Sequence, residues 1–154
     1  MFILSIIVII FLIDYIIKSY IVKNYDENFN KPFMKGHILL RFHKNKGAMM
    51  NIGEKHPSAV LFFSLFTAVL FIVTIIPELC KKNSYFIQTA FAFIMGGGIS
   101  NTCDRIFRRY VVDYFSFNIK KIKHIVFNLG DIFIFIGAAM LGACYVFKSI
   151  IHIK

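Results

Sequence analysis

The chain has 154 residues, of which 58% are hydrophobic and only 8 are acidic, and its formal net charge is +10. Soluble domains are about 45–50% apolar, so this composition excludes an ordinary water-soluble domain and favours a single membrane domain over residues 1–154. Lys and Arg are concentrated between apolar runs, where anionic lipid headgroups attract them, so the charge predicts no nucleic-acid partner. Cys and His show no metal-ligand spacing, and we expect no metal and no cofactor.

Four apolar runs are long enough to cross a bilayer as helices, at residues 2–22, 58–77, 85–103 and 129–151. The first run has no basic start and no small-residue cleavage site, so it predicts a retained helix and not a secretory signal. An even number of spans places both chain ends on one side of the membrane. The sequence therefore predicts an all-α, multi-pass membrane protein.

The spans are joined by two long polar segments and one short one. Residues 23–57 contain a stretch at 37–43 that predicts a strand, with a turn at 45–47. Residues 78–84 predict a short hairpin, and residues 104–128 are expected to form the second long loop. Both long segments fall on the side opposite the chain ends.

Several polar side chains lie inside or beside the spans. Asp14 and Lys18 are four residues apart, hence on one helix face, and either neutralise each other or support a site. Asp104 and Arg105 close the third apolar run and either pair with each other at the interface or support a site. The triple glycine at 96–98 favours close helix packing, with a substrate groove as the alternative.

Asp113 and Asp131 are 18 residues apart, and each lies beside an apolar run. A carboxylate next to hydrocarbon is costly and is usually there for function. Asn128 and Asp131 also have the spacing of a helix N-cap and its third helical residue, which is a purely structural alternative. Since the topology sends Asp113, Asn128, Asp131, Asn101 and Lys18 toward one membrane face, we predict two carboxyls that share one proton, as an aspartyl protease needs.

These polar residues fall in motifs that resemble the lipoprotein signal peptidase (signal peptidase II) family over about residues 14–142. The family's Asp-x-x-x-Lys is matched by Asp14 and Lys18. Its Asn-x-Gly-Ala-Ala-Phe is matched by Asn45-Lys46-Gly47-Ala48, and the chain then departs at Met49-Met50.

Three further motifs follow in order. Gly-Gly-Ala-x-Gly-Asn-x-x-Asp-Arg is matched by Gly96, Gly97, Asn101, Asp104 and Arg105, with Gly98 at the usual Ala and Ser100 at the second Gly. Val-Val-Asp-Phe is matched at 111–114, with Tyr114 for Phe. Phe-Asn-x-Ala-Asp is matched at 127–131, with Gly130 for Ala. Each motif alone is weak, but five in order at span boundaries are specific.

The resemblance implies four transmembrane helices, a small extracytoplasmic β element and a short amphipathic helix. It implies an aspartic-type endopeptidase that cuts diacylglyceryl-modified prolipoproteins just before the lipidated lipobox cysteine, with Asp113 and Asp131 catalytic. Substrate-binding or supporting roles fall on eight residues: Asp14, Lys18, Asn45, Gly47, Asn101, Asp104, Arg105 and Asn128. The protein would be a monomer in the bacterial cytoplasmic membrane, in contact with lipid, with cytoplasmic termini and its active site at the outer face.

Other interpretations stay open at this point. The two long polar segments hold 13 of the 18 Lys and Arg residues, so the positive-inside rule favours the opposite orientation. A diverged paralogue could bind lipoprotein or lipid without cutting it. A proton channel or transporter is disfavoured because the chain has no inverted repeat, and a presenilin-type protease because it has too few spans.

Overall fold

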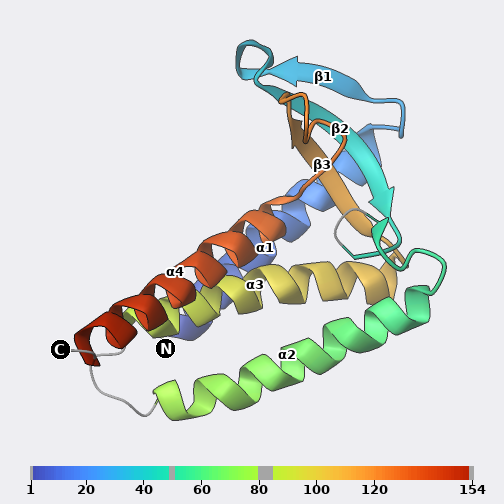
Figure 1. Cartoon of the computed structure of the whole chain (residues 1–154). Helices are drawn as coiled ribbons and strands as arrows, with labels where there is room; N and C mark the ends of the chain where they lie inside the picture. Colours follow the sequence, from blue (N-terminus) through green and yellow to red (C-terminus); the bar gives the residue numbers. More distant parts are fainter. Residues whose placement is uncertain (1, 49–50, 80–84, 153–154) are drawn as a thin grey trace.

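The computed structural model describes residues 2–48, 51–79 and 85–152. The described elements, in chain order, are α1 (Phe2–Asn24), β1 (Asn30–Phe33), the 3-10 turn η1 (Met34–Gly36), β2 (Ile38–Asn45), α2 (Pro57–Leu79), α3 (Tyr85–Phe107), β3 (Val111–Phe117) and α4 (Leu129–His152) (Figure 1). Each predicted span is a helix. The prediction of one loop over 104–128 is wrong, because α3 continues to Phe107 and β3 follows it.

Helix α3 lies at the centre of the bundle, in contact with α1, α2 and α4 (Figure 1). Two of its three consecutive glycines permit this close packing. A Cβ on Gly97 would lie 2.2 Å from the carbonyl oxygen of Gly130, and a Cβ on Gly96 would lie 2.8 Å from the Cβ of Ile10. Gly98 instead faces open space. The packing interpretation is therefore confirmed for Gly96 and Gly97.

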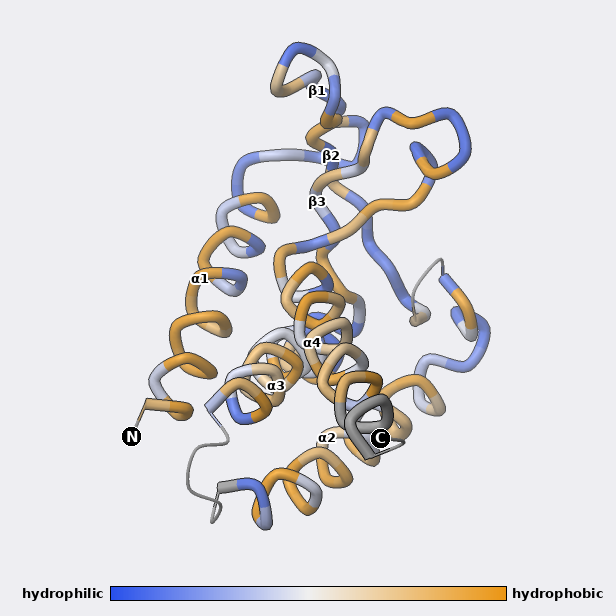
Figure 2. Tube along the Cα trace, turned by 60° about the vertical axis from the view of Figure 1, so that its left-hand side comes forward, coloured by the Kyte–Doolittle hydropathy of each residue, from blue (hydrophilic) through white to orange (hydrophobic). Residues whose placement is uncertain are grey.

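Helices α1, α2 and α4 are long and apolar enough to cross a membrane. Most of their residues are hydrophobic (Figure 2), and on α2 the residues Phe62, Phe63 and Phe66 are 63%, 61% and 50% exposed. Such a surface is stable against lipid and not against water. Helix α3 is more polar, which its neighbours permit by shielding it from the bilayer. The chain is therefore a mostly helical membrane protein.

The strands form a three-stranded antiparallel sheet in the order β1-β2-β3. The strand predicted at 37–43 is confirmed as β2, which runs on to Asn45. An irregularity between Leu40 and His43 resets the β2–β3 register, so that His43 pairs with Asp113 and Asn45 with Val111. A β-bulge re-aims the side chains that follow it. This register brings the end of β2 beside Asp113.

An apolar cluster fixes the sheet onto the end of the bundle. Ile21 of α1, Phe42 of β2, and Val112 and Tyr114 of β3 are each less than 9% exposed and pack together. Helix α1 begins, and helix α4 ends, at the opposite end of the bundle (Figure 1). The described residues contain no short amphipathic α-helix: residues 51–55 form turns, while residues 49–50 and most of the predicted hairpin at 78–84 lie outside the described part.

Candidate active site

Asn128 caps helix α4 and joins the two candidate carboxyls. Its side-chain oxygen accepts the backbone N–H of Asp131 at 2.9 Å, and its own backbone N–H donates to Oδ2 of Asp131 at 3.2 Å. This reciprocal pair confirms the predicted N-cap. Its amide nitrogen donates in addition to Oδ1 of Asp113 at 2.7 Å. The cap is therefore not an alternative to the site, because one fully buried residue serves both.

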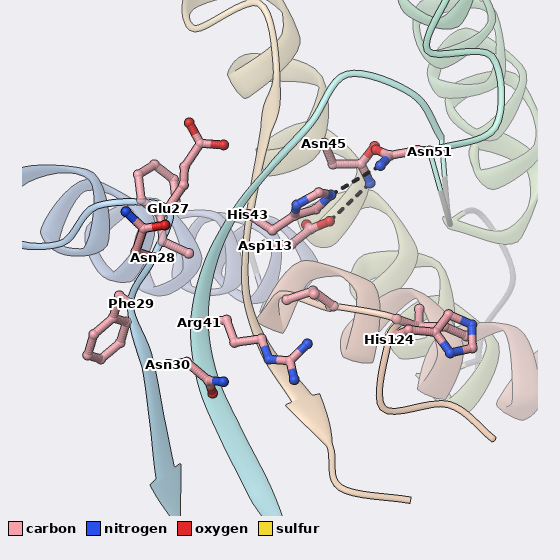
Figure 3. Close-up of a pocket in the computed structure, with 13 residues that line it drawn as sticks. Glu27, Asn28, Phe29, Asn30, Arg41, His43, Asn45, Asn51, Asp113 and His124 are labelled. Atoms are coloured by element: carbon pink, nitrogen blue, oxygen red, sulfur yellow. Dashed lines mark hydrogen bonds between the residues drawn. The ribbon is translucent and has the colours of Figure 1, made fainter. Parts of the chain in front are cut away.

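Asp113 lies on β3 and is 2% exposed. Asn45, at the end of β2, donates its side-chain amide to Oδ2 of Asp113 at 3.0 Å (Figure 3). Burial raises the pKa of Asp113 to about 7, assisted by repulsion from Asp131, while the hydrogen bonds from Asn45 and Asn128 oppose the rise. Asp113 therefore changes its protonation state near neutral pH.

Asn101 of α3 supplies the third amide of the site. Its nitrogen donates to Oδ1 of Asp131 at 2.8 Å, and its oxygen accepts from Nζ of Lys18 at 2.7 Å. The Lys18 bond fixes which end of the amide faces Asp131, because an ammonium can only donate. The two carboxyls are thus held by three Asn side chains from three different parts of the chain.

Asp14 and Lys18 form the predicted pair on α1, with 2.7 Å between Nζ and Oδ2, and both are fully buried. The pair supports the site and does not line it, since Lys18 reaches Asp131 only through Asn101. Nζ of Lys18 also lies 3.2 Å from Oγ of Ser100 and 3.4 Å from Oδ2 of Asp104. A buried ion pair needs such additional partners, because desolvation costs several kcal/mol per ion.

The predicted ion pair between Asp104 and Arg105 is wrong. Adjacent residues on a helix point about 100° apart, so they do not face each other. Asp104 instead pairs with Arg108, one turn on, and accepts the backbone N–H of Val112 at 3.0 Å. Asp104 thereby fixes the connection from α3 to β3.

Arg105 turns the other way, toward the loop after β2. Its guanidinium donates to the carbonyl oxygen of Gly47 at 2.9 Å and to that of Asn101 at 3.2 Å. Gly47 also donates its N–H to Oδ1 of Asn45 at 3.0 Å. No side chain fits at Gly47, because an added Cβ would lie 2.4 Å from the backbone carbon of Asn51.

Residues of the candidate site line parts of two cavities. A polar cavity of about 640 Å³ runs along β2 to Asp113 and is lined by Arg41, His43 and Asn45 among others (Figure 3). An apolar cavity of about 320 Å³, lined by residues of α2 and α3 together with Ala48 and Ile134, reaches Asn101 and Arg105. Gly98 lines the second cavity, so the groove interpretation of the glycines fits this third residue.

Sequence reasoning missed three polar side chains near the site. Ser100 donates to Oδ2 of Asp14 at 2.6 Å, and Tyr114 donates to Oδ1 of Asp14 at 3.1 Å. His43 lies opposite Asp113 in the sheet, with its Nε2 3.2 Å from the amide nitrogen of Asn51. Ser100 and Tyr114 each stand at a motif position where the chain departs from the family residue, and that departure was the available signal.

The same chain resembles known proteins in sequence and in fold. The family model described as signal peptidase (SPase) II matches residues 6–147. A lipoprotein signal peptidase from Caldanaerobacter subterraneus subsp. tengcongensis is 34% identical over 118 residues, which is 77% of each chain.

Two solved structures, both described as bacterial membrane enzymes determined by the in meso method, share the fold. Their TM-scores are 0.81 and 0.75 at 20% and 19% identity. The first match covers 96% of this chain and 88% of the other, and the second covers 93% and 91%. Both the helical bundle and the sheet therefore have counterparts in proteins of known structure.

Proposed function

Because the chain belongs to the signal peptidase II family, we propose that it is an aspartic-type endopeptidase that removes signal peptides from prolipoproteins. Its substrates are diacylglyceryl-modified, and it cuts just before the lipidated lipobox cysteine. Asp113 and Asp131 are the catalytic carboxyls. The observation that carries this proposal is that Asn128 hydrogen-bonds both carboxyls, one through its side chain and one through its backbone.

In this mechanism the carboxyl pair holds one proton. The raised pKa of Asp113, about 7, lets the pair keep that proton near neutral pH. The ionised carboxyl then takes a proton from the attacking water, while the protonated one donates to the scissile carbonyl oxygen. General acid–base help of this kind contributes about 10²–10⁴ in rate. Asn45, Asn101 and Asn128 keep both carboxyls in place, so little reorganisation is needed at the moment of reaction.

The two cavities suit the two parts of such a substrate. The apolar cavity between α2 and α3 would take an acyl chain of the diacylglyceryl group, since its wall at Gly98 is open and its inner end meets Asn101 and Arg105. The polar cavity at Asp113 would take the extended peptide after the cysteine. The cleaved bond then lies where the cavities approach each other, at the carboxyl pair.

We propose four membrane spans, with α3 as the fourth, cytoplasmic termini and the site at the outer face of the bacterial cytoplasmic membrane. The uneven distribution of Lys and Arg opposes this orientation. Labelling of Lys46→Cys and Lys82→Cys, each in a variant without native cysteines, with a membrane-impermeant thiol reagent tests it. Labelling of residue 46 alone in intact cells is expected, and labelling of residue 82 alone refutes the orientation.

Cleavage of a purified prolipoprotein, followed by gel shift with and without its diacylglyceryl group, tests the activity. Wild type is expected to cut only the lipidated form. Asp113→Asn and Asp131→Asn each remove a carboxyl that exchanges a proton in the reaction. Both variants are expected to insert into the membrane but to give no gel shift of the substrate. Asp26→Asn, at an exposed position, is the control and should give the same gel shift as wild type. Undiminished cutting by either site variant refutes the mechanism. Binding of lipidated substrate by wild type without product would identify a non-cutting paralogue.

The chain is expected to act as a monomer, because both carboxyls and all three amides come from one chain. The cleavage rate per mole of enzyme in detergent should then be independent of enzyme concentration. A specific rate that rises with concentration would refute this.

A further inference from the structure

Asp14 is a buried carboxylate with three hydrogen-bond donors around it. Its Oδ1 accepts from the hydroxyl of Tyr114 at 3.1 Å, and its Oδ2 accepts from Ser100 at 2.6 Å and from Lys18 at 2.7 Å. The exposed fraction of Asp14 is 0%, and that of Ser100 is 1%. Each oxygen of the Asp14 carboxylate therefore accepts a hydrogen bond from one hydroxyl group. The carboxylate itself is inaccessible to water and to lipid.

The two hydroxyls come from two of the departures from the family motifs, and a third departure lies beside them. The motifs have Gly, Phe and Ala where this chain has Ser100, Tyr114 and Gly130. Gly130 borders the same carboxylate, since a Cβ added there would lie 3.0 Å from Oδ2 of Asp14. Phe or Gly would donate nothing to Asp14, and Ala at 130 would crowd it. The three departures therefore meet at one side chain.

Two hydrogen-bonded routes lead from Asp14 to the carboxyl pair. In the first, Lys18 donates to Oδ1 of Asn101 at 2.7 Å, and Asn101 donates to Asp131 at 2.8 Å. In the second, the hydroxyl of Tyr114 accepts the backbone N–H of Leu129 at 2.9 Å, at the first residue of α4. Tyr114 also directly follows Asp113 along β3.

We propose that Ser100 and Tyr114 are coupled positioning residues of the peptidase reaction. Their hydroxyls hold the Asp14 carboxylate, and through it they set the Lys18–Asn101 contact and the start of α4 that present Asp131. The kinetic part of this inference rests on the proposed function. The coupling itself does not.

A double-mutant cycle in stability tests the coupling without any substrate. Ser100→Ala and Tyr114→Phe are each expected to raise the unfolded-to-folded ratio in detergent by about tenfold, because each removes a buried hydrogen bond to a charge. Since both hydroxyls share one acceptor, the effect of the double variant should differ from the product of the single effects by about threefold or more. Equality with that product would overturn the coupling.

A kinetic comparison separates positioning from mere stability. Each variant is expected to lower kcat about tenfold with KM within about twofold, because the carboxyl pair is misplaced while the binding surfaces persist. Ser100→Thr keeps the hydroxyl and should restore most of kcat. Tyr145→Phe, whose ring is 67% exposed on α4, is the matched control and should leave kcat unchanged.

The outcomes are distinguishable. Loss of stability with unchanged kcat in both variants would overturn the positioning role. If Tyr114→Phe does not fold, the comparison of Ser100→Ala with Ser100→Thr decides, and equal kcat in those two would overturn the role of the hydroxyl. If wild type cuts no lipidated substrate, the proposed function fails, while the stability cycle still decides whether the two residues are coupled.

Discussion

Asp113→Asn should flatten the pH dependence of stability. The folded-state pKa of Asp113 is about 7, against 3.8 for the unperturbed group. Between these values the folded chain binds a proton that the unfolded chain releases, so stability is fully present below about pH 4 and is lost as pH rises to about 7. Asn carries no ionisable proton, and the variant should not show this loss.

The magnitude follows from the difference between the two pKa values. At about 1.4 kcal/mol per pH unit, the interval from 3.8 to about 7 is worth about 4 kcal/mol of unfolding free energy. In a chain of this size that corresponds to a change in Tm on the order of 10 °C between acid and neutral pH. This change is measured as the difference in Tm between wild type and variant, because contributions common to both proteins cancel in that difference.

Thermal unfolding of the purified proteins in detergent at about pH 4 to 8 measures this difference. Wild type should lose Tm relative to Asp113→Asn as the pH rises, and Glu54→Gln, an exposed control in a turn, should follow wild type. Asp131→Asn should narrow the difference without removing it, since repulsion from Asp131 is the second cause of the raised pKa and burial is the first. Parallel curves for wild type and Asp113→Asn would refute the reasoning.

Substitutions at four further positions test single contacts. Asn128→Ala should lower stability by about 1–3 kcal/mol and abolish cleavage, while Asn128→Ser keeps a cap and should restore stability but not cleavage, as chemical denaturation and gel shift would measure. Gly98→Leu should raise KM for substrates with long acyl chains more than for short ones, because it narrows the apolar cavity; equal changes would argue against an acyl site. Gly97→Ala should instead impair folding, measured as recovery of monodisperse protein, because its Cβ would lie 2.2 Å from a carbonyl oxygen. Lys18→Met leaves the buried Asp14 unpaired and should cost about 3–5 kcal/mol in the same denaturation assay; a neutral effect would mean that the pair is not charged.

Apolar run length was sufficient to predict the four helices, because a helix in lipid must satisfy its backbone internally and its length follows the bilayer. Apolar run length did not predict the residue at which α3 ends. Asp104 and Arg105 look like the start of a polar loop, yet the helix continues because Asp104 finds Lys18 and Arg108 as partners. Arg108 lies only one turn on, but Lys18 comes from a distant part of the chain and leaves no local pattern.

The sheet was predicted only in part. β2 begins with three apolar residues and is partly or fully buried along its length, whereas β1 contains Pro32 and has every residue exposed, and β3 is buried almost throughout. Neither β1 nor β3 has period-two patterning. The register that puts Asp113 beside Asn45 depends on the irregularity in β2, which the sequence does not reveal. The candidate residues could thus be named from the motifs, but the partners of each could not.

The double use of Asn128 has a consequence for biogenesis. The same amide both starts α4 and joins the two acids, so the acids meet only once the last helix has formed against the finished sheet. A nascent chain that has inserted its first three helices carries Asp113 without its counterpart. On the proposed function, hydrolysis would then begin only with the last step of assembly.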